Sequence, residues 1–331
     1  GPANVVLNPN FASVISAEAS GNIVASDIIT IALRNGNGAV TFEVGLTIEG
    51  TGAQFLTATS DSTLNFTNNV SFVATAPVSL DAAVAMDSEG KGTGTVSYSV
   101  VDNPGVFTGS ALQISALAEA TSIVVNGNNT PNTINVSFFD LDTFVLNGFD
   151  GADTIYGSDG NDVIDGGAGA DVIYGRGGAD ILTGGAGADI FSFYSSVDSA
   201  ASIAANATVD FDQITDFTTG IDKLELDEIG GVNFNASATA VVTDVTVADV
   251  ATFSVLEAAI EAAIGSLTAS DVSTAQVYNV LLTGSGLAAA GVDHLVIVNN
   301  GDNALSSDDL MIGLFGTSSD SILSSDFHLI A

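Results

Sequence analysis

The stretch GGAGADVIYGRGGADILTGGAGADIF, which runs from Gly166 to Phe191, decides the fold of this chain. It is rich in glycine, which weakens a regular strand because it loses much backbone entropy on folding and has no side chain to pack. Yet an aspartate returns every nine residues, and a large apolar residue follows two positions after each one. A flexible linker has no need of this spacing, so the stretch predicts a repeating structure.

The repeat begins upstream at Gly148 and comprises five consecutive blocks of nine residues that end at Ser192. The blocks read GFDGADTIY, GSDGNDVID, GGAGADVIY, GRGGADILT and GGAGADIFS. The sixth position is always aspartate: Asp153, Asp162, Asp171, Asp180 and Asp189. The eighth is always large and apolar: Ile155, Ile164, Ile173, Leu182 and Phe191. Residues 127–135 (GNNTPNTIN) resemble a further, decayed block with Asn132 in the aspartate position.

Each block predicts a sharp turn followed by a strand of three residues. The first six positions are mostly small, and glycine can adopt the positive φ angles that tight turns require. The last three positions place one large apolar side chain in the middle of a short strand. Such a chain winds into a spiral of two facing parallel sheets with the apolar side chains between them. We therefore expect two blocks per coil, so that blocks n and n+2 stack.

Stacking brings aspartates eighteen residues apart together with the bare carbonyl groups of the turns. Two carboxylates about 4 Å apart repel by roughly 4 kcal/mol at an effective dielectric constant near 20. Calcium accepts about six to eight oxygen ligands, whereas magnesium retains its water and zinc prefers nitrogen and sulfur. The pattern therefore predicts several Ca²⁺ ions, with three well-formed sites and partial sites at the ends of the array. The expected ligands are the five repeat aspartates and the turn backbone at Gly148, Gly151, Gly157, Gly160, Gly166, Gly169, Gly175, Gly178, Gly184 and Gly187.

Some acidic residues lie outside the aspartate position. Asp150 and Asp159 occupy the third position, where we expect surface charge rather than ligands. Asp210, Asp212, Asp216 and Asp222 follow the repeat; they could hold another ion, but acidic turn residues are the favoured interpretation. The second position departs from glycine at Phe149, Ser158 and Arg176, and these changes are expected to weaken individual sites.

The pattern G-G-x-G-x-D-x-U-x, where U is a large apolar residue, resembles the RTX calcium-binding nonapeptide repeat. The resemblance covers about Gly127 to Ala331, because DQITDFTTGIDKLEL (212–226) and the ending SSDFHLIA are similar to segments that follow such repeats. It implies a parallel β-roll and secretion by a type I apparatus that reads an uncleaved C-terminal signal.

The chain is expected to be mainly β and to have three parts. Residues 3–120 favour an immunoglobulin-like β-sandwich, because Val40–Ile48 alternates with a period of two and the turn Arg34–Gly38 predicts a hairpin with Ile28–Leu33. Residues 121–192 form the RTX calcium β-roll. Residues 193–331 form a β-rich cap with the secretion signal and one short helix, Ser254–Gly265. Further strands are expected at Val70–Ala74, Thr95–Val101, Leu112–Leu117 and Met311–Leu314, and in YNVLLTG and HLVIVNN.

The composition excludes several classes of partner and activity. The 331 residues include 39 acidic and only four basic ones, for a formal net charge of −35, so we expect no nucleic acid partner and no anionic membrane partner. There is no cysteine, and no apolar run is long enough for a transmembrane helix. Because the sequence lacks HExxH, G-x-S-x-G, P-loop and dinucleotide-binding motifs, we expect no enzymatic activity.

These observations favour an extracellular, calcium-binding structural module, the C-terminal portion of a type I-secreted S-layer protein that folds and assembles on calcium. The expected partners are other copies of the chain in a surface layer and the secretion apparatus, with a cell-surface glycan or another surface protein as further candidates. Two alternatives stay open: an RTX adhesin segment, and the non-catalytic secretion and stability region of an RTX protease or lipase. Gly1-Pro2 resembles the remnant of a cleaved tag, so upstream sequence would discriminate between them.

Overall fold

A computed structural model divides the chain into two compact units, Gly1–Val125 and Asn126–Ala331. In the first unit it describes residues 13–15, 23–24, 40–42, 47–51, 53–54, 64–66, 71–74, 76–89, 96–97, 99–102, 104–106, 116, 118, 120 and 122–125. In the second it describes residues 126–139, 143–195, 198–199, 211–229, 232–233, 239–248, 258–259, 262, 274–283, 294–299, 309–315 and 322–329. Each unit is treated by itself below.

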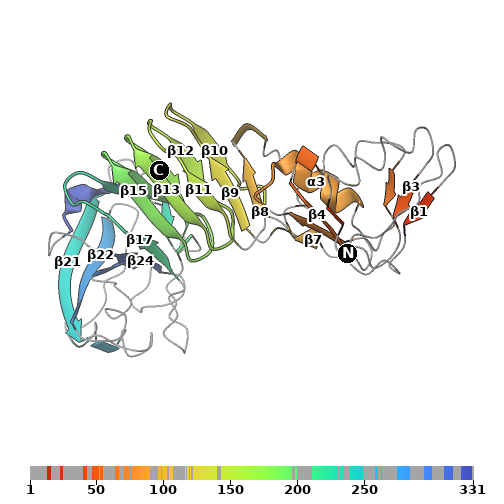
Figure 1. Cartoon of the computed structure of the whole chain (residues 1–331). Coiled ribbons are helices and arrows are strands. Elements are labelled where there is room, and N and C mark those ends of the chain that lie inside the picture. The colour runs from red at the N-terminus through yellow and green to blue at the C-terminus, as the bar shows by residue number, and fades with distance from the viewer. Residues whose placement is uncertain are drawn as a thin grey trace. The chain divides into compact units, whose positions relative to one another are not determined.

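The nonapeptide blocks form two parallel sheets in the second unit, drawn as stacked arrows in Figure 1. One sheet contains β10 (Thr133–Asn135), β12 (Thr154–Tyr156), β14 (Val172–Tyr174) and β16 (Ile190–Phe193). The other contains β11 (Val145–Asn147), β13 (Val163–Ala168) and β15 (Ile181–Ala186). Ile155 pairs with Ile173, and Ile164 pairs with Leu182, so strands eighteen residues apart lie side by side. This register confirms the expected β-roll with two blocks per coil.

The core of the roll is made by the apolar residue at the eighth position of each block. These five side chains are completely buried, and Ile134 and Leu146 extend the rows at the upstream end. On β13 and β15 the neighbouring positions are more exposed, since a strand turns alternate residues toward the core and toward the surface. A single apolar residue per coil on each side therefore fills the space between the sheets.

Truncating a core position should cost far more stability than truncating its neighbour. Leu182 is 0% exposed whereas the adjacent Ile181 is 40% exposed, although both lie on β15. We expect Leu182→Ala to lower the free energy of unfolding by about 2–5 kcal/mol, and Ile181→Ala to change it by about 0.5 kcal/mol or less. Urea unfolding in saturating calcium measures both, and equal losses would contradict the assignment of Leu182 to the core.

The segment after the repeat continues the roll with sequence that no longer follows the nonapeptide pattern. β17 (Asp212–Ile214) pairs in parallel with β15, and β18 (Lys223–Leu226) pairs in parallel with β16. β24 (Leu310–Leu314) and β25 (Phe327–Leu329) add one further strand to each sheet. The roll thus extends beyond the last glycine-rich block.

The remaining strands of the second unit widen one sheet and form a small hairpin. β23 (His294–Asn299), β22 (Thr274–Thr283) and β21 (Thr239–Ala248) follow β24 in that order across the sheet. β19 (Glu228–Ile229) and β20 (Val232–Asn233) form an antiparallel pair. The strands expected in YNVLLTG, HLVIVNN and Met311–Leu314 correspond to β22, β23 and β24. Most of the expected helix Ser254–Gly265 lies outside the described residues; residues 258, 259 and 262 are helical.

The described strands of the first unit pair in parallel. One sheet has the order β1 (Ser13–Ile15), β3 (Val40–Phe42) and β5 (Leu64–Phe66). The other has β2 (Ile23–Val24), β4 (Thr47–Gly50), β6 (Ser71–Ala74) and β7 (Val96–Ser97). β8 (Ser99–Asp102) pairs in parallel with β9 (Ser122–Asn126). The helix α3 (Leu80–Glu89) follows β6, and none of the helices among the described residues has the length and apolarity to span a membrane.

This pairing corrects the expectation for residues 3–120. An immunoglobulin-like sandwich is built from antiparallel sheets, whereas here strand partners recur in parallel 24 residues apart, as in Ile48 with Phe72 and Phe72 with Val96. The expected single strand Val40–Ile48 is divided between β3 and β4, which belong to different sheets. The expected hairpin partner Ile28–Leu33, its turn and nearly all of Leu112–Leu117 lie outside the described residues. Sequence alternation with a period of two marks a strand but does not give its direction.

Candidate calcium sites

The aspartates of the repeat lie in two buried rows, one along each turn edge of the roll. One row contains Asp153, Asp171 and Asp189 and ends with Asp222; the other contains Asp162 and Asp180 and ends with Asp212. None of these seven side chains is more than 4% exposed. The structure therefore brings the five predicted aspartates together as expected and adds two from the segment after the repeat.

One oxygen of each carboxylate holds the row together. The backbone N–H of Asp153 donates to Oδ1 of Asp171 at 2.7 Å, and that of Asp171 donates to Oδ1 of Asp189 at 2.9 Å. In the other row the N–H of Asp162 donates to Oδ1 of Asp180 at 2.7 Å. Asn132, in the decayed block, donates its backbone N–H to Asp153 in the same way, at 2.6 Å. These bonds fix the direction in which the second oxygen of each carboxylate points.

The second oxygen, Oδ2, has no hydrogen-bond donor at four of these positions within the described part of the chain: Asp153, Asp171, Asp180 and Asp212. It points toward the first glycine of its own block in every repeat. A Cβ placed on Gly148 would lie 2.5 Å from Oδ2 of Asp153, and one placed on Gly166 would lie 2.7 Å from Oδ2 of Asp171. A buried carboxylate oxygen without a donor is costly, so each of these positions needs a positively charged partner.

Backbone carbonyl oxygens also lie beside some of these first glycines. A Cβ on Gly166 would lie 2.8 Å from the carbonyl oxygen of Gly184, eighteen residues later. A Cβ on Gly148 or Gly157 would likewise collide with the carbonyl oxygen of Gly166 or Gly175. Carboxylate and carbonyl oxygens are the ligands that Ca²⁺ prefers. The nearest atoms are a carboxylate and a carbonyl oxygen at Gly148, Gly157 and Gly166, and a carboxylate oxygen at Gly175 and Gly184. Calcium fits this donor set.

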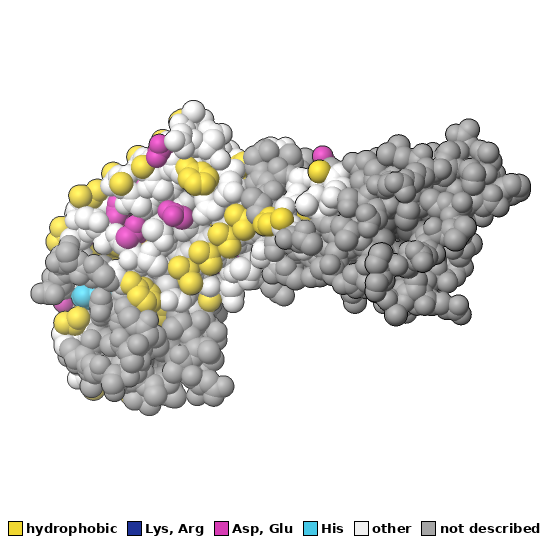
Figure 2. Space-filling view, viewed as in Figure 1, with side chains coloured by type: hydrophobic (Ala, Val, Ile, Leu, Met, Phe, Trp, Pro, Cys, Tyr) yellow, Lys and Arg dark blue, Asp and Glu magenta, His cyan; other side chains and the backbone are white. Residues whose placement is uncertain are grey.

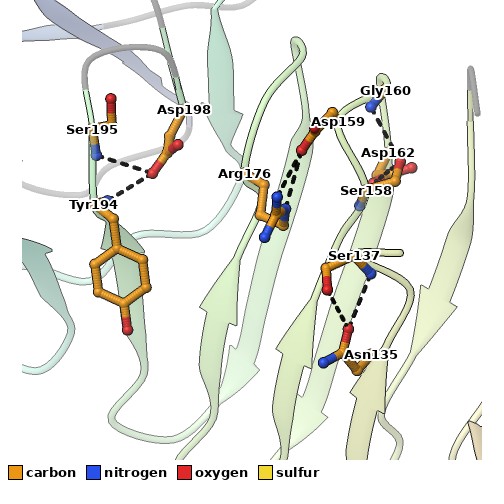
Figure 3. A network of polar contacts seen from close by, with 10 residues as sticks. All are labelled: Asn135, Ser137, Ser158, Asp159, Gly160, Asp162, Arg176, Tyr194, Ser195 and Asp198. Carbon is orange, nitrogen blue, oxygen red and sulfur yellow. Dashed lines mark hydrogen bonds and ion pairs between the residues drawn. The ribbon is translucent and has the colours of Figure 1, made fainter. Parts of the chain in front are cut away.

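Asp162 differs because Ser158 takes the second position of its block. Its Oδ2 accepts hydrogen bonds from the backbone N–H of Ser158 at 2.6 Å and from the Ser158 hydroxyl at 3.0 Å (Figure 3). The N–H of Gly160 in turn donates to the same hydroxyl at 3.1 Å. Donors from the protein already satisfy this oxygen, so Ser158 reduces the need for an ion here.

The fourth glycines allow the turns to stack closely. Gly151 and Gly178 have φ angles of +132° and +121°, which other residues rarely adopt. A Cβ on Gly169 would overlap the carbonyl oxygen of Gly151, and one on Gly187 would overlap that of Gly169. Gly160 supplies the carbonyl oxygen that lies against Gly178. The fourth position therefore sets the distance between coils on which the carboxylate rows depend.

Side chains at the third position lie on the surface, as expected for Asp159. Its carboxylate forms an ion pair with Arg176 at 2.9 Å, and the two side chains are 59% and 40% exposed (Figure 3). Arg176 and Phe149 are the non-glycine residues with positive φ among the described residues. The departures from glycine at Phe149 and Arg176 are thus tolerated at the cost of local backbone strain.

Burial raises the pKa of the carboxylates in both rows. The pKa of Asp189 rises to about 6, mainly through desolvation, with a further contribution from the charge of Asp222. Burial also raises the pKa values of Asp180 and Asp212. The charge of Asp180 raises the pKa of Asp212 further, and the charges of Asp162 and Asp198 raise that of Asp180. The ionised rows are therefore unfavourable in the folded chain when no cation is bound, and a divalent ion removes this penalty.

The calcium-free protein should gain β-structure as the pH falls from 7 toward 5. A carboxylate with a raised pKa in the folded state binds protons more tightly there than in the unfolded chain. Acid therefore stabilises the folded roll between the ordinary pKa of 3.8 and the raised value, which for Asp189 is about 6. Circular dichroism of decalcified protein at pH 7, 6 and 5 tests this.

High salt at pH 7 provides the control, since it screens the surface charge without protonating buried groups. A calcium-free spectrum that stays constant down to pH 5 would contradict the role given to the carboxylate rows. In calcium-loaded protein we expect the opposite effect of pH: acid should destabilise the folded roll, because protons compete with the ion for the same oxygens.

Sequence reasoning left Asp212 and Asp222 open as ligands of another ion but favoured acidic turn residues, and the structure places both at the ends of the carboxylate rows. Asp212 precedes Ile214 by two positions and Asp222 precedes Leu224 by two positions, as each repeat aspartate precedes its core residue. This aspartate-x-apolar pattern was the available signal. Among the described residues no three His, Cys, Asp or Glu side chains form a group that could hold a metal ion.

Comparison with known proteins supports calcium binding. Residues 147–182 and 156–191 match the family model of the RTX calcium-binding nonapeptide repeat, so the five blocks are RTX repeats that bind calcium. Proteins with these repeats are typically secreted, which supports an extracellular location. The solution structure of the AlgE6R3 subunit from the Azotobacter vinelandii mannuronan C5-epimerase is similar to part of this chain. The alignment covers 61% of this chain and 80% of the subunit, with 21% sequence identity and a TM-score of 0.23. No curated protein matches the chain.

Proposed function

We propose that the chain is a non-catalytic structural module of a type I-secreted surface layer protein, which folds and assembles when it meets calcium outside the cell. The observation that carries the proposal is the pair of buried carboxylate rows. Four of their Oδ2 atoms have no donor among the described residues, and those of Asp153 and Asp171 lie beside backbone carbonyl oxygens. These rows lie inside the β-roll and along its length, where an ion stabilises the fold. Ions bound in these rows would make the β-roll more rigid.

The surface of the roll supports a role in assembly. Val163 and Ile181 are 37% and 40% exposed and are register partners on neighbouring strands, so they form part of an exposed apolar row. Figure 2 shows rows of hydrophobic side chains on the roll. An apolar row of this kind suits lateral contact with another copy of the chain. The formal net charge of −35 also means that two copies approach more readily when calcium neutralises part of it.

Electron microscopy of the purified chain over a range of calcium concentrations tests the proposal. Ordered sheets or arrays are expected in millimolar calcium, and separate particles in chelator. A double variant, Val163→Ser with Ile181→Ser, should keep the circular dichroism spectrum of the folded roll but assemble less. Calcium-loaded, folded protein that stays monodisperse at every concentration would argue against a surface layer and leave calcium binding by the repeat intact.

A further inference from the structure

We propose that Asp212, which lies outside the nonapeptide repeat, completes an additional calcium site with Asp180 and so ties the C-terminal part of the second unit to the roll. This inference rests on the proposed calcium-dependent function. The RTX family match ends at residue 191, and Asp212 follows Asp180 by 32 residues rather than the eighteen of the repeat. The nonapeptide spacing alone therefore does not predict this site.

The backbone places Asp212 as if it belonged to a sixth block. β17 pairs in parallel with β15, and Ile214 stands opposite the core residue Leu182. The N–H of Asp180 donates to Oδ1 of Asp212 at 2.9 Å, the same bond that links the aspartates within the repeat. Asp212 is 0% exposed. It thus occupies the aspartate position of the next coil.

Two unpaired carboxylate oxygens meet at this position. Oδ2 of Asp180 and Oδ2 of Asp212 are both buried without a hydrogen-bond donor among the residues that the structure describes. A Cβ on Gly175 would lie 3.2 Å from Oδ2 of Asp212 and still closer to Oδ2 of Asp180. Both oxygens therefore face the same small volume beside Gly175. Two buried negative charges that face one space with no donor between them are unfavourable, and a bound cation removes this penalty without protonation.

The surroundings add the negative charge of Asp198, and the charge of Arg176 also acts on Asp198. The charge of Asp198 acts on both carboxylates, and this residue is held in place by the backbone N–H groups of Tyr194 at 2.7 Å and Ser195 at 3.1 Å (Figure 3). The second unit contains two basic residues, Arg176 and Lys223. Arg176 pairs with Asp159, and Lys223 lies beside Asp326 and the carbonyl oxygen of Ser325. A hard divalent ion is the partner that fits.

The other row ends differently, and this contrast defines the site. Asp222 accepts the N–H of Asp189 at 3.0 Å through Oδ1, as Asp212 accepts that of Asp180. Its Oδ2, however, accepts the backbone N–H of Thr218 at 2.7 Å. A backbone donor therefore satisfies the last carboxylate of the row that ends at Asp222. The last carboxylate of the other row, Asp212, has no such donor among the described residues and can bind an ion.

An ion at Asp212 would couple calcium to the strands beyond the repeat. The N–H of Asp212 donates to the hydroxyl of Ser199 at 2.7 Å, and that hydroxyl donates to the carbonyl oxygen of Met311 on β24 at 2.5 Å. Asp212 also stands opposite Ile312 in the register of β17 with β24. Fixing the Asp212 carboxylate would therefore fix the point at which β24 joins the roll.

The number of bound ions in matched variants tests the site. Calcium bound per chain is measured by equilibrium dialysis and elemental analysis for the whole chain, for Asp212→Asn and for Asp222→Asn. The asparagine retains Oδ1 as an acceptor but removes the charge and can place an N–H₂ group in the site. We expect Asp212→Asn to bind one ion fewer than the unmodified chain and Asp222→Asn to bind the same number. Asp165→Asn, which changes an exposed carboxylate, controls for net charge.

Equal ion numbers for Asp212→Asn and the unmodified chain would overturn the inference, as would an equal loss in Asp222→Asn. An unmodified chain that binds no calcium would instead overturn the proposed function itself. If Asp212→Asn fails to fold, terbium in crystals of the unmodified chain gives a direct answer. An anomalous peak between the carboxylates of Asp180 and Asp212 is expected there, and its absence in crystals with terbium bound elsewhere in the roll would exclude the site.

Discussion

Removing calcium is expected to abolish the regular structure of the β-roll at neutral pH. An ion that binds the folded chain and not the unfolded one adds about 2.7 kcal/mol at a hundredfold excess over its Kd. Three such ions contribute about 8 kcal/mol, which is comparable to the whole stability of a typical domain, about 5–15 kcal/mol. Without the ions, the buried carboxylates with raised pKa values also act against folding.

Far-UV circular dichroism and thermal unfolding measure this effect with calcium, with chelator, and after calcium is restored. The β signal should collapse in chelator and return with calcium, and the melting temperature should rise with calcium concentration. Magnesium at the same concentration is the control, because its preference for octahedral geometry and retained water makes it a poor substitute. A melting curve that is the same with calcium and with chelator would refute a structural role for the ions.

The repeat could be predicted from sequence almost completely, because one local pattern determines several levels of its structure. The spacing of Ile155 and Ile173 gives the coil length, their apolar character gives the core, and the aspartates two residues earlier give the polar edge. Each block packs mainly on copies of itself, so no distant segment has to be known. The observed register of Ile155 with Ile173 follows from this local regularity.

Prediction failed where structure depends on partners that the local pattern does not name. In the first unit, alternation at Val40–Phe42 identifies a strand, but its parallel neighbours β1 and β5 come from distant segments. The same holds for Asp212, because the chain between the last block and β17 interrupts the period of eighteen residues. Only the parallel pairing of β17 with β15 shows that Asp212 lies next to Asp180.

Replacing Gly178 with alanine is expected to destabilise the roll strongly, whereas the same change at Gly177 is expected to be harmless. Gly178 has a φ of +121°, and a Cβ there would lie 2.5 Å from the carbonyl oxygen of Gly160 in the coil below. Alanine must therefore both adopt a strained backbone conformation and push two coils apart. Strain of this kind costs about 1–3 kcal/mol by itself, and the displaced turn also carries Asp180, so calcium affinity should fall with stability.

Gly177 is the matched control because it is the adjacent residue in the same turn. The nearest atoms to a Cβ on Gly177 belong to Asp159 and lie at 3.7 Å or more, which is ordinary van der Waals contact. Alanine in such a place reduces the entropy of the unfolded chain and should leave stability unchanged or raise it by up to about 1 kcal/mol. Urea unfolding and calcium titration of the two variants compare them directly. Equal behaviour would mean that glycine serves only flexibility in these turns, whereas a loss confined to Gly178→Ala would show that close stacking of coils builds the calcium sites.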